Sequence, residues 1–112
     1  MFSQNIDCSS FKIGEFKYVN PKYSEWKITR TDSLQIEISS KTGIEIHSLV
    51  NWKSDCEYVL TCTKVLYSNP ENILGQIFTV FITETYSDRY RCISKNTDTK
   101  IQDLELEIIK VK

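Results

Sequence analysis

Alanine is absent from this 112-residue chain, glycine occurs three times and histidine once. Alanine is the strongest helix former, whereas the β-branched and aromatic residues that dominate here suit the half-buried surface of a pleated sheet. Three glycines offer little for a phosphate-binding loop, and neither G-x-x-x-x-G-K-[ST] nor G-x-G-x-x-G occurs. The composition therefore predicts an all-β fold and argues against the common nucleotide-binding loops.

Long apolar runs and blocks of one charge are also missing. No run approaches the roughly 20 apolar residues that a membrane-spanning helix requires. The 14 basic and 15 acidic residues are mixed along the chain and give a net charge of −1. This balance lacks the basic patch through which proteins bind nucleic acids. We therefore expect no nucleic-acid partner and no transmembrane segment, and the sequence leaves the oligomeric state open.

The N-terminal stretch MFSQNIDC has no positively charged region followed by an apolar one. We therefore expect no signal peptide in this stretch. Four cysteines in a short sequence nevertheless favour disulfides and an oxidising compartment. The favoured interpretation is an exported protein, periplasmic, cell-surface or secreted, whose signal peptide is missing here. A cytoplasmic protein is the alternative.

Short strand-like segments, rather than helices, fill the sequence, whose length fits a single domain over residues 1–112. The predicted strands cover residues 11–19, 25–30, 34–40, 44–52, 56–67, 76–85, 89–95 and 104–108. Their short connections predict an antiparallel meander, and eight such strands can close into a small barrel without exposed edges. A two-sheet β-sandwich is the alternative.

The third predicted strand has a regular alternation that assigns its faces. Leu34, Ile36 and Ile38 alternate with the polar residues Gln35 and Glu37. A strand with one buried face places its apolar residues inward and its polar residues outward. We therefore expect the three aliphatic side chains to face the interior of the fold.

The first predicted strand changes parity at Gly14. Phe11 and Ile13 share one face, whereas Phe16 and Tyr18 share the other. One extra residue at a β-bulge moves an apolar set across a sheet, and glycine is common at such positions. The sequence therefore predicts a bulge at this glycine.

Two short segments carry a resemblance to a known family. The segment GEFKY, residues 14–18, is similar to the G-x-W/F start of lipocalin-like (calycin) barrels. Trp52, followed by DCEYVL at residues 55–60, resembles the central strand of small exported lipocalin-like bacterial proteins. As an architecture, the resemblance covers most of the chain. It implies a barrel that can hold a small apolar ligand, and it transfers no catalytic residue.

The four cysteines do not have the spacing of a metal site. No C-x₂₋₄-C pair occurs, and His47 is distant from Cys8, Cys56, Cys62 and Cys92 in the sequence. In an up-and-down barrel, Cys8 precedes the first strand and Cys56 opens the fifth, so both lie at the same end. The favoured disulfide is therefore Cys8–Cys56, whereas Cys62 and Cys92 either form a second bridge across the interior or stay free.

Residues capable of catalysis are few. His47 falls on the polar face of its strand, where a solvent-exposed or cross-strand role is expected. Glu105 and Glu107 are paired carboxylates, but on the outer face of a strand such residues more often serve solubility. We therefore expect no enzymatic activity, no cofactor and no metal.

Aromatic residues are the candidates for ligand binding. Those on the expected inner faces are Phe16, Tyr18, Trp26, Trp52, Tyr58 and Tyr90. Eight-stranded barrels are just wide enough either to be filled by side chains or to hold one small ligand. The leading hypothesis is a binding module for a small apolar ligand in the barrel or at its mouth, or for a protein partner. The rival is a structural or inhibitory protein-interaction domain with a solid core.

Overall fold

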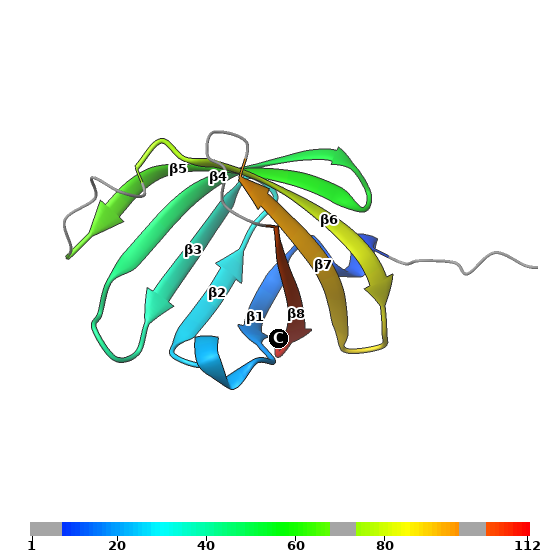
Figure 1. The fold of residues 1–112 in the computed structure, drawn as a ribbon, viewed down its shortest axis with the longest axis horizontal. Helices are drawn as coiled ribbons and strands as arrows, with labels where there is room; N and C mark the ends of the chain where they lie inside the picture. Colours follow the sequence, from blue (N-terminus) through cyan, green and yellow to red (C-terminus); the bar gives the residue numbers. More distant parts are fainter. Residues whose placement is uncertain (1–7, 68–73, 97–102) are drawn as a thin grey trace, which may run out of the picture.

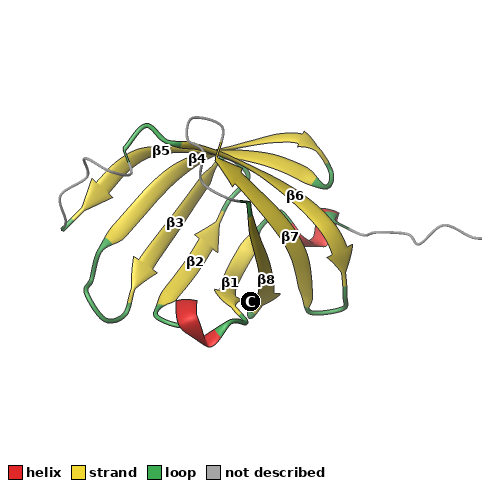
Figure 2. Ribbon diagram, viewed as in Figure 1, coloured by secondary structure: helices red, strands yellow, loops and turns green. Residues whose placement is uncertain are grey.

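Eight β-strands form a closed antiparallel barrel in the computed structural model, which describes residues 8–67, 74–96 and 103–112 (Figure 1, Figure 2). The strands are β1 Gly14–Tyr18, β2 Trp26–Arg30, β3 Leu34–Ser39, β4 Glu45–Ser54, β5 Glu57–Leu66, β6 Ile77–Thr85, β7 Arg89–Asn96 and β8 Leu104–Lys110. Two 3₁₀ helices, η1 Ser9–Phe11 and η2 Pro21–Tyr23, flank β1. Each strand pairs with its neighbours in sequence, and β8 closes the barrel against β1.

The closure of β8 onto β1 confirms the predicted meander barrel and excludes the two-sheet sandwich. In this pairing, Phe16 lies opposite Lys110 and Tyr18 lies opposite Ile108. The contact gives both terminal strands a second hydrogen-bonding neighbour, so that neither is left as an open edge. Within the described ranges, no helix is long and apolar enough to cross a membrane.

The first strand is shorter than predicted, and the predicted parity switch has another cause. Phe11 belongs to η1 and is buried, whereas Ile13 is 56% exposed. The strand begins at Gly14, whose φ of +145° favours glycine, and a Cβ there would lie 2.6 Å from the carbonyl oxygen of Lys112. The glycine therefore permits close approach of the C-terminal backbone, and the bulge prediction was wrong.

A disulfide joins Cys8 to Cys56, as predicted, with a Cα–Cα distance of 5.2 Å. It fastens η1 across the end of the barrel at which β4 turns into β5, here called the closed end. A bridge that spans 48 residues stabilises a fold by about 3–4 kcal/mol in the chain-entropy account. Cys62 and Cys92 are both buried, and both are free thiols.

The faces of β3 are the reverse of those predicted. Gln35 and Ser39 are buried at 3% and 2% exposure, whereas Ile38 is 40% exposed. Cross-strand partners share a face of a sheet, and Gln35 is paired with the buried Arg30 of β2. The polar set of β3 therefore faces the interior, and Leu34, Ile36 and Ile38 face outward.

The side chain of Arg30 explains this reversal. Arg30 shares the inner face of β2 with Ile28, and both are 1% exposed. A buried guanidinium without hydrogen-bond acceptors costs several kcal/mol, more than exposing a few aliphatic side chains. Gln35 supplies one acceptor only in the observed register, and a one-residue slip would turn it outward. The register therefore satisfies the buried charge at the expense of the aliphatic face.

Candidate functional site

The guanidinium of Arg30 lies inside the barrel near the closed end, where neutral groups accept its hydrogen bonds. Its Nε donates to Oε1 of Gln35 at 2.9 Å, and Nη1 donates to the carbonyl oxygen of Phe11 at 2.8 Å. Nη2 donates to the hydroxyls of Tyr58 and Tyr90, at 3.2 and 2.9 Å. Four of its five N–H groups are thus engaged, which fixes the side chain in one position.

Aromatic rings enclose the same guanidinium. Its carbon lies 4.6 Å from the ring centroid of Phe16 and 4.8 Å from that of Tyr58. Burial alone would lower the pKa of Arg30, but interactions with Tyr58 and Tyr90 outweigh it and raise the pKa. Burial also raises the pKa of both tyrosines, which therefore remain neutral donors and acceptors. Arg30 is therefore charged in the folded protein.

A second polar pair lies further from the closed end, between Tyr18 of β1 and Glu37 of β3. The hydroxyl of Tyr18 donates to Oε1 of Glu37 at 2.5 Å, and Nε2 of Gln35 lies 3.4 Å from Oε2. Burial raises the pKa of Glu37, and the hydrogen bonds from Tyr18 and Gln35 oppose this effect. Arg30, Gln35, Glu37 and Tyr18 together form a continuous line of hydrogen bonds, here called the polar track.

An interior cavity of about 190 Å³ lies beside the polar track. The four residues of the track line one part of it, and its remaining lining is mostly apolar: Ile28, Leu60, Phe78, Val80, Leu106 and Ile108. A smaller cavity of about 120 Å³ adjoins it and is lined by Tyr23, Trp26 and Ile46. Tyr18 and Glu37 border both cavities, so their hydrogen bond stands between the two spaces.

The six aromatic residues predicted to bind a ligand divide into two groups. Three of them line the cavities: Tyr18, Trp26 and Tyr58. Phe16 and Tyr90 are buried at the closed end, with ring centroids 6.2 Å apart, and line neither space. Trp52 packs against Tyr58 at 4.6 Å and lies beneath the ammonium of Lys12. Phe16 and Tyr90 pack around Arg30, and Trp52 packs against Tyr58, which does so as well.

Three polar residues of the site, Arg30, Gln35 and Glu37, were not among the residues predicted to bind a ligand. The prediction places Gln35 and Glu37 on the outer face, because it takes the aliphatic residues of β3 to face the interior. The parity of β2 contained the missing signal, since Trp26, Ile28 and Arg30 alternate on one face. An arginine on an apolar face implies a buried guanidinium that requires polar partners on the next strand.

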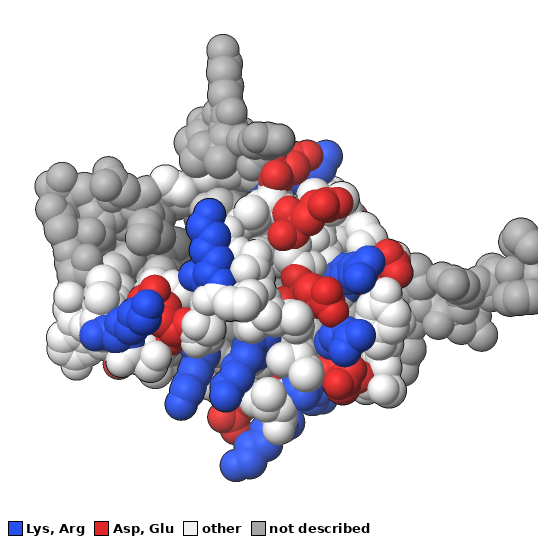
Figure 3. Space-filling view, turned by 60° about the horizontal axis from the view of Figure 1, so that its bottom comes forward, with Lys and Arg blue, Asp and Glu red and all other residues white. Residues whose placement is uncertain are grey.

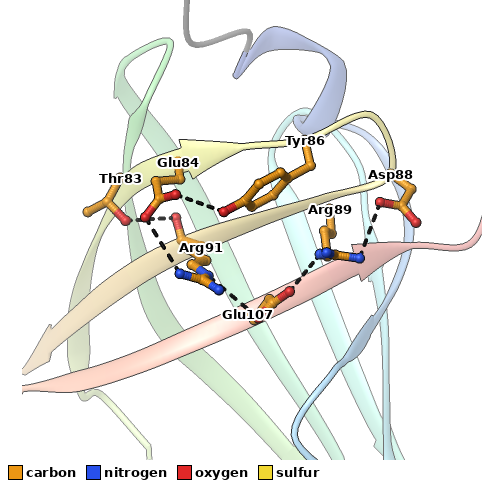
Figure 4. Close-up of polar contacts among 7 residues, drawn as sticks. All are labelled: Thr83, Glu84, Tyr86, Asp88, Arg89, Arg91 and Glu107. Carbon is orange, nitrogen blue, oxygen red and sulfur yellow. Dashed lines mark hydrogen bonds and ion pairs between the residues drawn. The ribbon is translucent and has the colours of Figure 1, made fainter. Parts of the chain in front are cut away.

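A different arginine group lies on the outer surface of β6–β8 (Figure 4). Nε of Arg89 lies 2.6 Å from Glu107, and Arg91 bridges Glu84 and Glu107 at 3.7 and 3.6 Å. The Tyr86 hydroxyl donates to Glu84 at 2.7 Å. We call these five residues the outer cluster. Acidic and basic side chains are interspersed on the face drawn in Figure 3, without a large area of one sign.

A hollow of about 430 Å³ borders the outer cluster, but the charges of the cluster that line it already have partners. Glu84, Arg91 and Glu107 all line it. Because each charge is ion-paired within the cluster, a ligand there would have to replace existing contacts. Exposed ion pairs of this kind contribute about 0–1 kcal/mol each. The interior cavity is the better candidate site.

Neither a metal site nor a similarity to a known protein assigns a function to the barrel. In the part of the chain that the structure describes, no group of three or more His, Cys, Asp or Glu residues is placed to hold a metal ion. The chain matches no protein-family model, and comparisons with curated proteins and with solved structures gave no significant match. The function is therefore argued from the geometry of the barrel.

Proposed function

We propose that this barrel is a non-enzymatic binding module that holds one small, mainly apolar ligand in its interior. The observation that carries the proposal is the cavity of about 190 Å³ with apolar walls and a single line of polar groups. Small-molecule sites are commonly apolar with a few placed polar groups that orient the ligand. A solid core, the rival arrangement, would leave no such space.

The volume limits the size of the ligand. An engineered apolar cavity of roughly 150 Å³ accepts benzene, whereas drug-sized ligands occupy roughly 300 Å³ or more. A molecule about the size of a single substituted ring therefore fits the interior cavity. A longer molecule that reached the second cavity would pass the residues that border both spaces, among them the hydrogen-bonded pair Tyr18 and Glu37.

The state of the reactive groups supports binding rather than catalysis. Arg30 is held by four hydrogen bonds, and Glu37 accepts a hydrogen bond from Tyr18. Burial raises the pKa of the Cys92 thiol to about 12, so it is not a thiolate near neutral pH. A nucleophilic cysteine needs the opposite shift.

The Cys8–Cys56 disulfide supports an exported location for this module. Disulfides persist in the periplasm, at cell surfaces and in secreted proteins, and are rare in the cytosol. We therefore propose that the protein works outside the cytoplasm. Detection of the oxidised form by mass spectrometry, in protein recovered from its native compartment, tests this point, and a fully reduced form there would contradict it.

Binding of small ring compounds to two matched variants tests the proposed function. Leu106→Trp fills the cavity, whereas Thr79→Trp adds the same ring on the outer side of β6. We expect fragment screening by ligand-observed NMR to find binders that Thr79→Trp retains and Leu106→Trp loses by tenfold or more in affinity. A library without binders, or equal binding by the two folded variants, would contradict the proposal and favour the interaction domain with no small-molecule site.

A further inference from the structure

The outer face of β2–β4 carries an apolar stripe that no part of the described chain covers. Leu34, Ile36 and Ile38 point outward from β3, and Leu49 lies beside Leu34 on β4. Ile38 is 40% and Leu49 is 52% exposed, and Leu34 and Ile36 are half-buried. Single exposed aliphatic residues are ordinary, but contiguous ones mark interaction surfaces.

Charged residues flank this stripe in a single cross-strand row. Lys27 of β2 is paired with Ile38, and Ile38 is paired with Glu45 of β4. Adjacent strands are about 4.8 Å apart, so the ammonium-bearing and carboxylate-bearing positions lie about 10 Å apart on opposite sides of Ile38. The next row also has an isoleucine at its centre: Ile36 lies between Thr29 of β2 and His47 of β4. The row through Ile38 thus has a basic residue on one side and an acidic residue on the other, and both rows have an apolar centre.

We propose that this face docks against the same face of a second copy of the chain, about a twofold axis that runs along β3. Such an axis places β3 against β3 and β2 against β4, and keeps each row at its own height. Each Lys27 then faces Glu45 of the other copy, and the aliphatic residues meet between the two ion pairs. Twofold interfaces are self-complementary in this way.

The charge pattern selects a second copy over other occupants. Among the described residues, Lys27 forms no ion pair, while Glu45 contacts His47 at 3.2 Å. An acidic partner would be repelled by Glu45, and a basic partner by Lys27. An anionic membrane surface would also be repelled by Glu45. Only a partner with the two signs in mirrored order satisfies both flanks, and the chain itself supplies that order.

The area of the stripe sets the strength of the association. Three rows on three strands form a smaller contact than the roughly 1,200–2,000 Å² of standard stable interfaces. We therefore expect a weak dimer with a dissociation constant in the micromolar range. Sedimentation velocity from low micromolar to near-millimolar concentration measures this equilibrium directly.

A charge exchange is the decisive experiment. Lys27→Glu and Glu45→Lys should each weaken the dimer by about fivefold or more, since each removes two symmetric ion pairs. The double variant Lys27→Glu/Glu45→Lys should restore association to within about twofold of wild type. Lys53→Glu, an exposed change of the same sign outside the stripe, should have no effect.

Two apolar variants keep the test independent of folding. Ile36→Glu should abolish the dimer. Leu49→Glu should do the same at a position that is 52% exposed, where we expect the fold to tolerate a charge. A circular dichroism spectrum shows that each variant is folded. A monomer at every concentration would overturn the proposal, as would a dimer unaffected by these variants or a double variant without recovery. Adsorption of monomer to anionic vesicles through this face would overturn it as well.

Discussion

The barrel wall separates two arginine groups that have the same chemistry and opposite surroundings. Arg30, inside, is 1% exposed, and its hydrogen bonds go to an amide, a carbonyl and two hydroxyls. Arg89 and Arg91, outside, have side chains that are 41% and 52% exposed and pair with carboxylates. The inner arginine explains the register of β3, whereas the outer pair lies on the solvent side of β7. Burial, rather than formal charge pairing, decides how much an arginine constrains a structure.

The largest expected effect follows from removing the inner arginine. Arg30→Met leaves Oε1 of Gln35 and the carbonyl oxygen of Phe11 buried without their donor. The hydroxyls of Tyr58 and Tyr90 keep only their mutual hydrogen bond at 3.0 Å, and the free energy of unfolding should fall by about 3–5 kcal/mol. Arg30→Lys should not restore the loss, because an ammonium cannot reach the four acceptors together. Urea denaturation followed by tryptophan fluorescence measures both variants.

A compensated variant sharpens this interpretation. Replacing the side-chain partners as well, with Gln35→Leu, Tyr58→Phe and Tyr90→Phe in the Arg30→Met background, should recover at least part of the lost stability. Of the groups that Arg30 contacts, only the carbonyl oxygen of Phe11 then remains without its donor. If Arg30→Met alone cost less than about 1 kcal/mol, the inner network would be no more important than an exposed ion pair.

The disulfide at the closed end should have the next largest effect. The double variant Cys8→Ser/Cys56→Ser should lose about 2–4 kcal/mol of unfolding free energy, because the unfolded chain is no longer constrained. Cys62→Ser, at a free buried thiol, is the matched control for loss of a sulfur atom. Before reduction, a thiol count on unfolded protein should give two reactive cysteines, and a count of four would contradict the bridge.

Glu37 should make stability depend on pH in a definite direction. Burial raises its pKa above the usual glutamate range, so the folded state binds its proton more tightly than the unfolded state. The stabilisation from the protonated Glu37 is complete below the usual glutamate pKa. It is lost as the pH rises through the pKa of Glu37 in the folded state. The stability of Glu37→Gln relative to wild type should therefore rise with pH above the usual range. Glu15→Gln, outside on β1, controls for removal of a carboxylate, and identical pH profiles for wild type and Glu37→Gln would contradict the burial effect.

Substitutions in the outer cluster should change the free energy of unfolding least. Arg91→Gln and Glu107→Gln should each change the free energy of unfolding by less than about 1 kcal/mol, because solvent already screens these pairs. High salt should remove most of the difference from wild type. If either variant lost as much unfolding free energy as Arg30→Met, the outer arginines would constrain the fold as strongly as the inner one, which contradicts the comparison.

The sequence predicted the barrel well, because composition and strand order are distributed over the whole chain. It also predicted the Cys8–Cys56 bridge, since strand order alone places both cysteines at one end. The inner face of β3 was predicted wrongly. Alternation within one strand identifies two faces but not which is buried, and the choice came from Arg30 on the neighbouring strand. The polar track could therefore not be read from β3 alone.

Thiol labelling at two adjacent positions tests the orientation of β3 most directly. Ile38 is 40% exposed on the outside, and Ser39 is 2% exposed on the inside. In a Cys62→Ser/Cys92→Ser background, Ile38→Cys should react rapidly with a water-soluble thiol reagent, whereas Ser39→Cys should react only on unfolding. Rapid reaction at position 39 and protection at position 38 would contradict the reversed strand, and with it the polar track on which the proposed function rests.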